Sequence, residues 1–213
     1  AERTGSRVFA DEIHAPLVFP GSAHVPYASV SPAAAAHAIT AVSASKAFNI
    51  PGLKCAQMIF SNPADRRRFA ELGEFVAHST ANPGIAATIA AYREGDSWLA
   101  ELVDYLDGNR RALAGLLAEH LPAAQHLPAE GGYIAWVDLR AYDLGDDPAG
   151  FLREHAGVAL TDGRECGTAG AGHVRINTAT PRAILVEIVE RTAEAITGRA
   201  GAARPAPAPA PTR

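Results

Sequence analysis

Apolar and polar residues follow two patterns along the first half of the chain, short apolar runs and segments of helical period. Short apolar runs bounded by turn residues are typical of strands, and segments of helical period are typical of helices. A Ser-Pro pair marks a helix start, because Ser caps the first turn and Pro needs no partner for a backbone donor there. The predicted strands lie at 7–11, 39–43 and 53–60. The predicted helices begin at Ser31-Pro32, at Asn62-Pro63 (to about His78) and at Pro83 (to about Leu121, with weak points at Gly95 and Gly108).

The second half of the chain has shorter predicted elements and ends in a biased tail. Residues 199–213 hold repeated Ala-Pro pairs, and proline cannot donate the backbone hydrogen bonds of a regular element. We therefore expect a disordered, polyproline-like tail over these residues. The predicted strands are 132–139, 158–160 and 173–177, and the predicted helices are 148–155 and a segment from Thr180-Pro181 to about Gly198.

These elements predict an α/β fold with two domains before the tail. We expect residues 1–95 to complete a large domain with a mostly parallel sheet and flanking helices, and residues 96–198 to form a small α+β domain. The apolar run at 7–10 is typical of a buried strand, which needs neighbours on both sides. Residue 1 is Ala rather than Met. We therefore expect this chain to be the C-terminal portion of a longer protein.

The composition narrows the class of protein. Hydrophobic residues make up 48% of the 213 residues and charged residues 20%, which supports a packed core. The net charge of -4 is modest, and the triplet 66–68 (three arginines) is better explained as a solvated helix face than as a nucleic-acid patch. Cys55 and Cys166 share no metal-ligand spacing with histidines. No apolar stretch approaches the roughly 20 residues that span a bilayer, so we expect a soluble, cytoplasmic protein without a metal, membrane or nucleic-acid partner.

The scarcity of lysine draws attention to one segment. Of the 19 lysines and arginines, only Lys46 and Lys54 are lysines. A chain so rich in arginine retains lysine where a guanidinium cannot serve, for example as an amine that forms a Schiff base, although chance survival of two surface lysines explains the composition equally well. The context favours Lys46: Ser43 and Ser45 precede it at the end of a predicted strand, where hydroxyls can bond a phosphate. Lys54 can add a positive charge beside that phosphate.

Two further positions carry candidate chemistry. Asp11 ends the first predicted strand, where an acid can pair with a protonated pyridine nitrogen, although a turn or cap is the commoner role of Asp there. His14, three residues later, is no more informative by itself. Arg175 lies in an otherwise apolar strand, and a buried guanidinium needs a partner. A substrate carboxylate and an internal Asp or Glu are equally good candidates for that partner.

Taken together, these segments resemble fold-type I pyridoxal-phosphate enzymes of the aminotransferase class I/II family. Within that group they resemble most the cystathionine beta-lyase branch, the cysteine-S-conjugate beta-lyases of the MalY/PatB type. The resemblance covers about residues 1–198. Each motif alone is a weak signal for the family, but together the motifs are highly specific. They are Asp11-Glu12-Ile13-His14, Ser45-Lys46-Ala47-Phe48-Asn49-Ile50 and 175–182, with support from 82–88, 108–110 and 132–138 in the expected order.

The resemblance implies a role for each candidate residue. Lys46 would carry pyridoxal 5'-phosphate, Asp11 would face the pyridine nitrogen, and Arg175 would hold the substrate carboxylate. Ser43 and Ser45 would lie near the phosphate. His14 would lie close to the cofactor ring. Many family members have an arginine where this chain has Lys54, and a lysine supplies the charge without the bidentate fork.

The implied reaction is elimination from a small amino acid, cystathionine or a cysteine S-conjugate, to pyruvate, ammonia and a thiol. Lys46 would remove the Cα proton before a thiolate leaves Cβ. Transamination uses the same lysine, aspartate and arginine, and only the resemblance to the lyase branch favours elimination. The intact enzyme would be a homodimer. The N-terminal half of the family is absent from this chain, so we expect the chain alone to be inactive. A non-catalytic truncated fragment is the alternative of another class.

Overall fold

The chain forms two compact units, each with its own sheet. The structure is a computed structural model that describes residues 1–72, 78 and 80–202. Unit 1 comprises Ala1–Tyr105 and Glu130–Gly132, and unit 2 comprises Leu106–Ala129 and the described residues from Tyr133 on. The division falls inside a helix and later than the boundary expected after residue 95. The assignment of 1–95 and 96–198 to functional domains stays a prediction.

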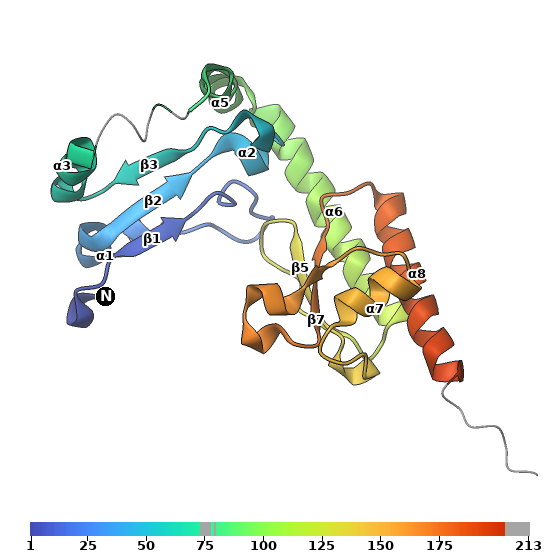
Figure 1. Cartoon of the computed structure of the whole chain (residues 1–213). Coiled ribbons are helices and arrows are strands. Elements are labelled where there is room, and N and C mark those ends of the chain that lie inside the picture. Colours follow the sequence, from blue (N-terminus) through green and yellow to red (C-terminus); the bar gives the residue numbers. More distant parts are fainter. Residues whose placement is uncertain (73–77, 79, 203–213) are drawn as a thin grey trace, which may run out of the picture. The chain divides into compact units, whose positions relative to one another are not determined.

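The sheet of unit 1 combines a parallel and an antiparallel pair (Figure 1). Its described strands are β1 (Val8–Asp11), β2 (Ala38–Val42) and β3 (Gln57–Phe60), in the order β1-β2-β3. β1 and β2 are parallel, with Asp11 opposite Ala41, and β3 is antiparallel to β2. Because parallel strands end at the same edge of a sheet, the residues that follow Asp11 and Val42 lie at one edge.

The first α-helix of unit 1 begins where its sequence signal predicts. Ser31 caps α1 as predicted, because its side chain accepts from the backbone N–H of Ala34 across 3.0 Å. The predicted strand at 53–60 is wrong in its first part, since the chain turns there and Lys54 has a left-handed φ of 52°. The helices are α1 (Pro32–His37), α2 (Ala44–Ala47), α3 (Pro63–Leu72) and α5 (Asn82–Glu94), with 3-10 turns at Glu2–Thr4, Tyr27–Ser29 and Pro51–Leu53. Residues 73–77, in the predicted second helix, lie outside the described residues.

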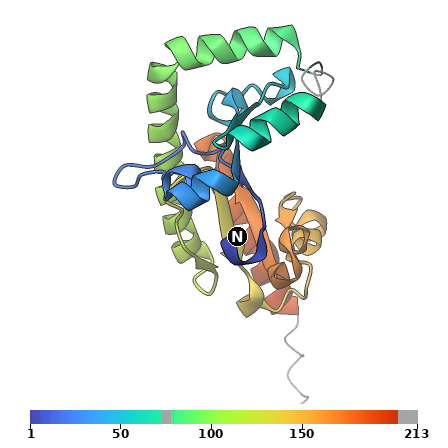
Figure 2. The same ribbon diagram turned by 90° about the vertical axis from the view of Figure 1, so that its left-hand side faces the viewer.

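The long helical segment breaks at one of its two predicted weak points. α6 (Asp96–His120) follows α5 directly, and Figure 2 shows the sharp change of direction between them. A side chain at Gly95 would collide with the ring of Phe48, so glycine allows this close approach. Gly108 does not interrupt α6, which runs through both units.

Unit 2 is built on an antiparallel sheet. The predicted strand at 158–160 is wrong: Gly157 has a positive φ of 63°, the Val158 amide bonds to the carbonyl of Leu152, and pairing begins only at Thr161. α8 continues to Ala202, beyond the predicted end near Gly198, while 203–213 lie outside the described residues. The elements are β4 (Gln125–His126), β5 (Ile134–Asp138), α7 (Pro148–His155), β6 (Thr161–Asp162), β7 (His173–Asn177) and α8 (Arg182–Ala202), with sheet order β4-β5-β7-β6 and 3-10 turns at Arg140–Tyr142, Gly163–Cys166 and Thr168–Gly170.

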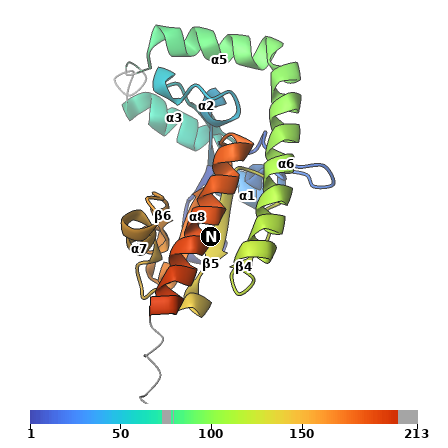
Figure 3. The same cartoon turned by 90° about the vertical axis from the view of Figure 1, so that its right-hand side faces the viewer.

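One face of this sheet is packed into a hydrophobic core and the other is not. Alternate residues of β5 and β7, such as Val137 and Val174, are buried against leucines of α6 and α8, such as Leu113 and Leu185. Figure 3 shows α6 and α8 on this side of the sheet. The opposite face carries polar and aromatic side chains, among them Trp136, which is 39% exposed. No described helix is long and apolar enough to cross a membrane.

Candidate functional site

Asp11 lies at the edge where the parallel strands of unit 1 end. Its carboxylate Oδ1 accepts from the backbone N–H of Ile13 across 3.3 Å, so it also serves as a turn residue. The backbone N–H of Glu12 donates to the carbonyl of Ala41 at 2.9 Å, which continues the pairing of β1 with β2 past Asp11. Asp11 itself is exposed. A solvent-accessible carboxylate is thus held beside the carboxyl end of β2.

Lys46 follows β2 on the short helix α2, whose start is fixed by Ser43. The Ser43 hydroxyl accepts from the backbone N–H of Ser45 (3.1 Å) and donates to the carbonyl of Cys55 (2.6 Å). Since that donation uses the hydrogen of Ser43, the 2.7 Å contact between the two serine oxygens is a donation from Ser45. Trp98 secures the other end of α2 by donating to the carbonyl of Ala47 at 3.3 Å. Lys46 is half-buried on this fixed turn.

His14 brings Asp11 and Lys46 into one cluster. The pKa of His14 is lowered from its ordinary value by burial first and by the positive charge of Lys46 second, while the carboxylate of Asp11 opposes the shift. Both charges therefore act on the same imidazole. A lowered pKa favours the neutral imidazole at neutral pH, so His14 adds a polar but uncharged ring within the electrostatic reach of an acid and an amine.

Lys54 directly precedes Cys55, the residue whose carbonyl accepts from the Ser43 hydroxyl. It is exposed, and its left-handed backbone carries the chain from the turn at 51–53 to Cys55, whose carbonyl bonds to Ser43. Lys54 is thus joined to the start of α2 by one residue of chain. Its predicted contact with a phosphate stays a prediction.

Arg175 projects from β7 in unit 2. It stands opposite Trp136 of β5 and Thr161 of β6, and it is half-buried. Within the described part of the chain, no hydrogen bond or ion pair to its guanidinium is found. Of the two partners that the sequence allows, an internal Asp or Glu is therefore not present among these residues. The fork is available for a ligand carboxylate.

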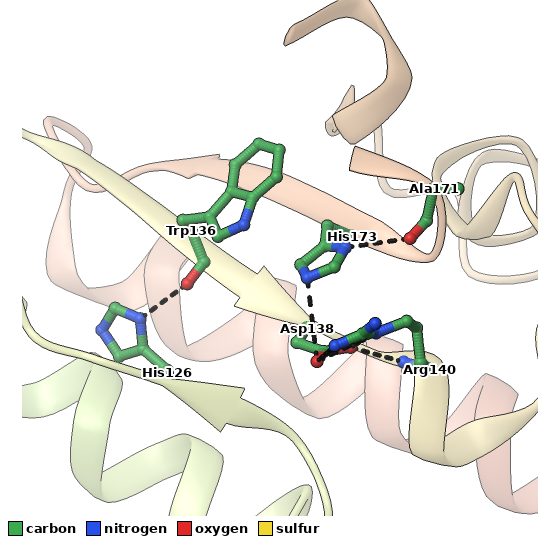
Figure 4. A network of polar contacts seen from close by, with 6 residues as sticks. All are labelled: His126, Trp136, Asp138, Arg140, Ala171 and His173. Atoms are coloured by element: carbon green, nitrogen blue, oxygen red, sulfur yellow. Dashed lines mark hydrogen bonds and ion pairs between the residues drawn. The ribbon is translucent and has the colours of Figure 1, made fainter. Parts of the chain in front are cut away.

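A polar network shares this sheet face with Arg175, and sequence reasoning did not single out its members (Figure 4). Arg140 binds Asp138 through Nε and Nη2 at 2.7 to 3.1 Å, which is the main reason why the pKa of Asp138 falls to about 2. Nδ1 of His173 donates to the carbonyl of Ala171 across 2.9 Å, and Nε2 of the same ring lies 3.7 Å from the carboxylate of Asp138. Its ring stacks on Trp136 with centroids 5.2 Å apart. The period-2 alternation of β5 and β7 is the signal that could have placed these side chains on one face.

The end of β7 is fixed by a fully buried amide. The side-chain nitrogen of Asn109 donates to the carbonyls of Thr178 (2.7 Å) and Thr180 (2.8 Å), and its oxygen accepts from Nε of Arg182 (2.6 Å). Both N–H donors of this amide and one of the two lone pairs on its oxygen are thus used in hydrogen bonds. The motif at 108–110 contained Asn109, but its role required the tertiary structure.

The donor set of unit 1 fits pyridoxal phosphate in most respects. The amine of Lys46 suits the aldehyde, the acid of Asp11 suits the pyridine nitrogen, and the Lys54 charge suits the phosphate. Ser43 fits less well as a phosphate donor, because its hydroxyl hydrogen already goes to the carbonyl of Cys55. Among the residues that the structure describes, no group of His, Cys, Asp or Glu could hold a metal ion.

Comparison with known proteins supports the resemblance seen in the motifs. A putative cystathionine beta-lyase of Mycobacterium tuberculosis is 42% identical over 93% of this chain and 52% of its own length. Cystathionine beta-lyase PatB of Bacillus subtilis is 31% identical over 90% of this chain and 50% of its own length. The chain thus spans about half the length of the curated relatives it matches.

Solved structures show the same fold. A putative PLP-dependent beta-cystathionase from Corynebacterium diphtheriae superposes with a TM-score of 0.86 and 41% identity, covering 92% of this chain and 52% of that chain. The predicted α/β fold and the predicted likeness to the cystathionine beta-lyase branch are confirmed. Residues 1–191 match the family Aminotransferase class I and II. The chain belongs to the aminotransferase class I and II family.

Proposed function

We propose that this chain is the lysine-bearing half of a pyridoxal-phosphate-dependent C–S beta-lyase. The substrate would be cystathionine or a cysteine S-conjugate, and the products pyruvate, ammonia and a thiol. The observation that carries the proposal is the cluster at the edge of unit 1, where the charges of both Lys46 and Asp11 act on the pKa of His14. The relatives named as cystathionine beta-lyases favour this reaction among those open to the family.

The cofactor, when bound, supplies an electron sink that makes the Cα proton of an amino acid acidic. Lys46 Nζ would bind the cofactor's aldehyde and, once released, accept the proton from the substrate Cα. Asp11 would keep a proton on the pyridine nitrogen through its carboxylate. His14 would lie beside the ring as a neutral imidazole.

Other residues would position the phosphate and the substrate. Ser45 and Lys54 would bind the phosphate, with Ser43 either joining them or holding α2 in place through its contact with Cys55. Arg175 would bind the substrate carboxylate with its fork, which the described residues leave available. In this proposal, 1–95 belong to the large cofactor-binding domain and 96–198 to the small one. The intact enzyme would be a cytoplasmic homodimer.

Labelling of the lysines tests the cofactor site. The chain and the product of its complete coding region are each mixed with pyridoxal phosphate, followed by a visible spectrum, borohydride reduction and mapping of the modified lysine. We expect a yellow species fixed on Lys46, lost in Lys46→Ala and retained in the matched control Lys54→Ala. Absence of an adduct in both proteins, or equal labelling of Lys46 and Lys54, would overturn the proposal.

Product analysis separates lyase from aminotransferase. With cystathionine as the only organic substrate, elimination releases pyruvate and a thiol without any keto-acid acceptor. Transamination stops after one turnover unless an acceptor is added. We expect continuous pyruvate release from the complete protein. Turnover that depends wholly on added keto acid would assign the protein to the aminotransferases instead.

A further inference from the structure

The chain leaves unit 2 for three residues between β4 and β5. Glu130–Gly132, here called the strap, belongs to unit 1 although the chain on both sides belongs to unit 2. The backbone N–H of Phe19 donates to the carbonyl of Glu130 at 2.9 Å, and that of Gly132 donates to the carbonyl of Leu17 at 2.6 Å. Val18 and Gly131 form a β-bridge between these bonds. The strap is thus paired with the segment that follows β1.

The geometry of the strap favours glycine at both of its last two positions. A Cβ on Gly131 would stand 2.7 Å from the carbonyl oxygen of Leu17 and 3.4 Å from Cα of Val18. These are backbone atoms, which cannot move aside as a side chain can. Gly132 has a φ of 77°, a conformation that costs other residues about 1 kcal/mol or more. Any other residue at 131 would push the strap away from its partner.

The segment that the strap holds leads back to His14. The backbone N–H of Leu17 donates to the carbonyl of His14 at 2.9 Å, and Leu17 and Phe19 are both buried. Nδ1 of His14 lies 3.7 Å from the position that a Cβ of Gly132 would take, so a side chain at residue 132 would reach van der Waals contact with this imidazole. The strap is thus bonded to the turn that begins at His14 and lies close to its ring.

The residue after the strap is anchored as firmly in unit 2. The carbonyl of Tyr133 accepts from the backbone N–H of Thr178 (2.8 Å) and from its hydroxyl (3.0 Å). Thr178 follows β7, the strand of Arg175. Four consecutive residues, 130–133, are thus bonded to the turn behind His14 at one end and to the end of β7 at the other.

We infer that the strap is a positioning element of the proposed site, with Gly131 as its determining residue. It acts by fixing the 14–19 turn, so that the imidazole of His14 keeps its place beside Asp11 and Lys46. The importance of the position of His14 rests on the proposed function. The pairing of the strap with residues 17–19 does not. His14 and the strap glycines then act together, in addition to the roles proposed for the other site residues.

The test compares Gly131→Ala with Gly115→Ala, in the protein with its cofactor and without it. Gly115 is an exposed helical glycine with open space at its Cβ position, so alanine there is harmless. For Gly131→Ala we expect amide exchange at Phe19 and Gly132 to quicken about tenfold, and the pyridoxal phosphate dissociation constant to rise about tenfold, which is about 1.4 kcal/mol. NMR titration should also show the pKa of His14 returning toward its ordinary value. The control should match the wild type.

Gly132 supplies a second pair of variants in case Gly131→Ala folds poorly. Asn tolerates a positive φ and Val does not, so Gly132→Asn should keep the exchange protection that Gly132→Val loses. Unchanged exchange and His14 titration in Gly131→Ala would overturn the inference. So would faster exchange with unaltered cofactor affinity, because the strap would then be only structural. If the wild type binds no cofactor, the proposed function fails. Amide exchange and the titration of His14 would then still show whether the strap holds the 14–19 turn.

Discussion

The side-chain nitrogen of Asn109 donates to the carbonyl oxygen of Thr178 across 2.7 Å, which ties helix α6 to the end of β7. The contact is fully buried, and the same amide also serves Thr180 and Arg182. A buried carbonyl that loses its donor keeps the full penalty of leaving water. The chain just after Arg175 is therefore held by a side chain from a distant helix in addition to the bonds between Thr178 and Tyr133.

Asn109→Asp should destabilise the protein by about 2 to 3 kcal/mol although it hardly changes the shape of the side chain. The acid keeps an acceptor for Arg182 but turns an oxygen toward the carbonyls of Thr178 and Thr180. Urea unfolding measures the effect. Asn177→Asp is the control, because Asn177 is exposed and its oxygen already acts as the acceptor for Ala179. Equal stability of the two variants would contradict this account.

Asp138 should make the stability of unit 2 depend on acid pH. Its pKa of about 2 in the folded protein, lowered chiefly by Arg140, lies below the ordinary value of about 3.9. A carboxyl with a depressed pKa stabilises the fold above pH 4, and this stabilisation is lost as the pH falls toward 2. Because Arg140 is largely exposed, we expect the melting temperature to lose only roughly 2 °C through this pair.

The measurement is thermal unfolding at pH 4.5 and pH 2.5 of the wild type and Asp138→Asn. The variant should lack this part of the pH dependence, and the difference between the two proteins should shrink at pH 2.5. Asp143→Asn is a control, since Asp143 is not in the network. A parallel pH profile for the wild type and Asp138→Asn would refute the prediction.

Ser43→Ala should weaken the cofactor-free protein by about 1 to 3 kcal/mol. The variant loses the cap of α2 and leaves the carbonyl of Cys55 without its donor. Calorimetry without cofactor separates this structural role from any contact with a phosphate. Ser97→Ala, at an exposed position in the first turn of α6, should change stability by less than about 0.5 kcal/mol. A Ser43→Ala protein as stable as that control would exclude the capping role.

Arg175→Lys should raise the KM of the complete enzyme for its amino acid about 10- to 100-fold, with a smaller effect on kcat. Lysine keeps the charge but lacks the fork that grips a carboxylate. Arg153→Lys, on the exposed side of α7, is the matched control. Steady-state kinetics decide the matter, and a KM that rises no more than in the control would remove Arg175 from the proposed substrate site.

Leu185→Ala and Ile184→Ala should differ sharply although the residues are neighbours on α8. Leu185 is fully buried in the core of unit 2, whereas Ile184 is 47% exposed. Removing the buried side chain should cost about 2 to 5 kcal/mol, while the exposed one should cost about 1 kcal/mol or less. Chemical denaturation gives both values, and similar losses would mean that α8 packs with another face.

Local signals alone were enough to predict several secondary-structure elements. The helix at Pro148–His155 matches its prediction, because Asp147 caps it and Pro148 starts it within the same few residues. The strand at His173–Asn177 also matches. Lys46 was proposed from its place after a predicted strand and Asp11 from its place at the end of another, and their roles stay predictions. The parallel pairing that sets these two strand ends at one edge is a tertiary feature. Helix caps and the period of a strand depend on neighbours in the sequence, so the sequence by itself determined these elements.

What the tertiary structure decided are the pairings between distant segments. The alignment of Arg175 with Trp136, the bonds of Asn109 to Thr178 and the strap at 130–132 join residues far apart along the chain. A sequence pattern sets the period of an element but not its partner or register, because these depend on how whole faces pack and which buried polar groups find partners. The strand predicted at 158–160 failed for the same reason: its apolar residues entered the core of unit 2 without pairing.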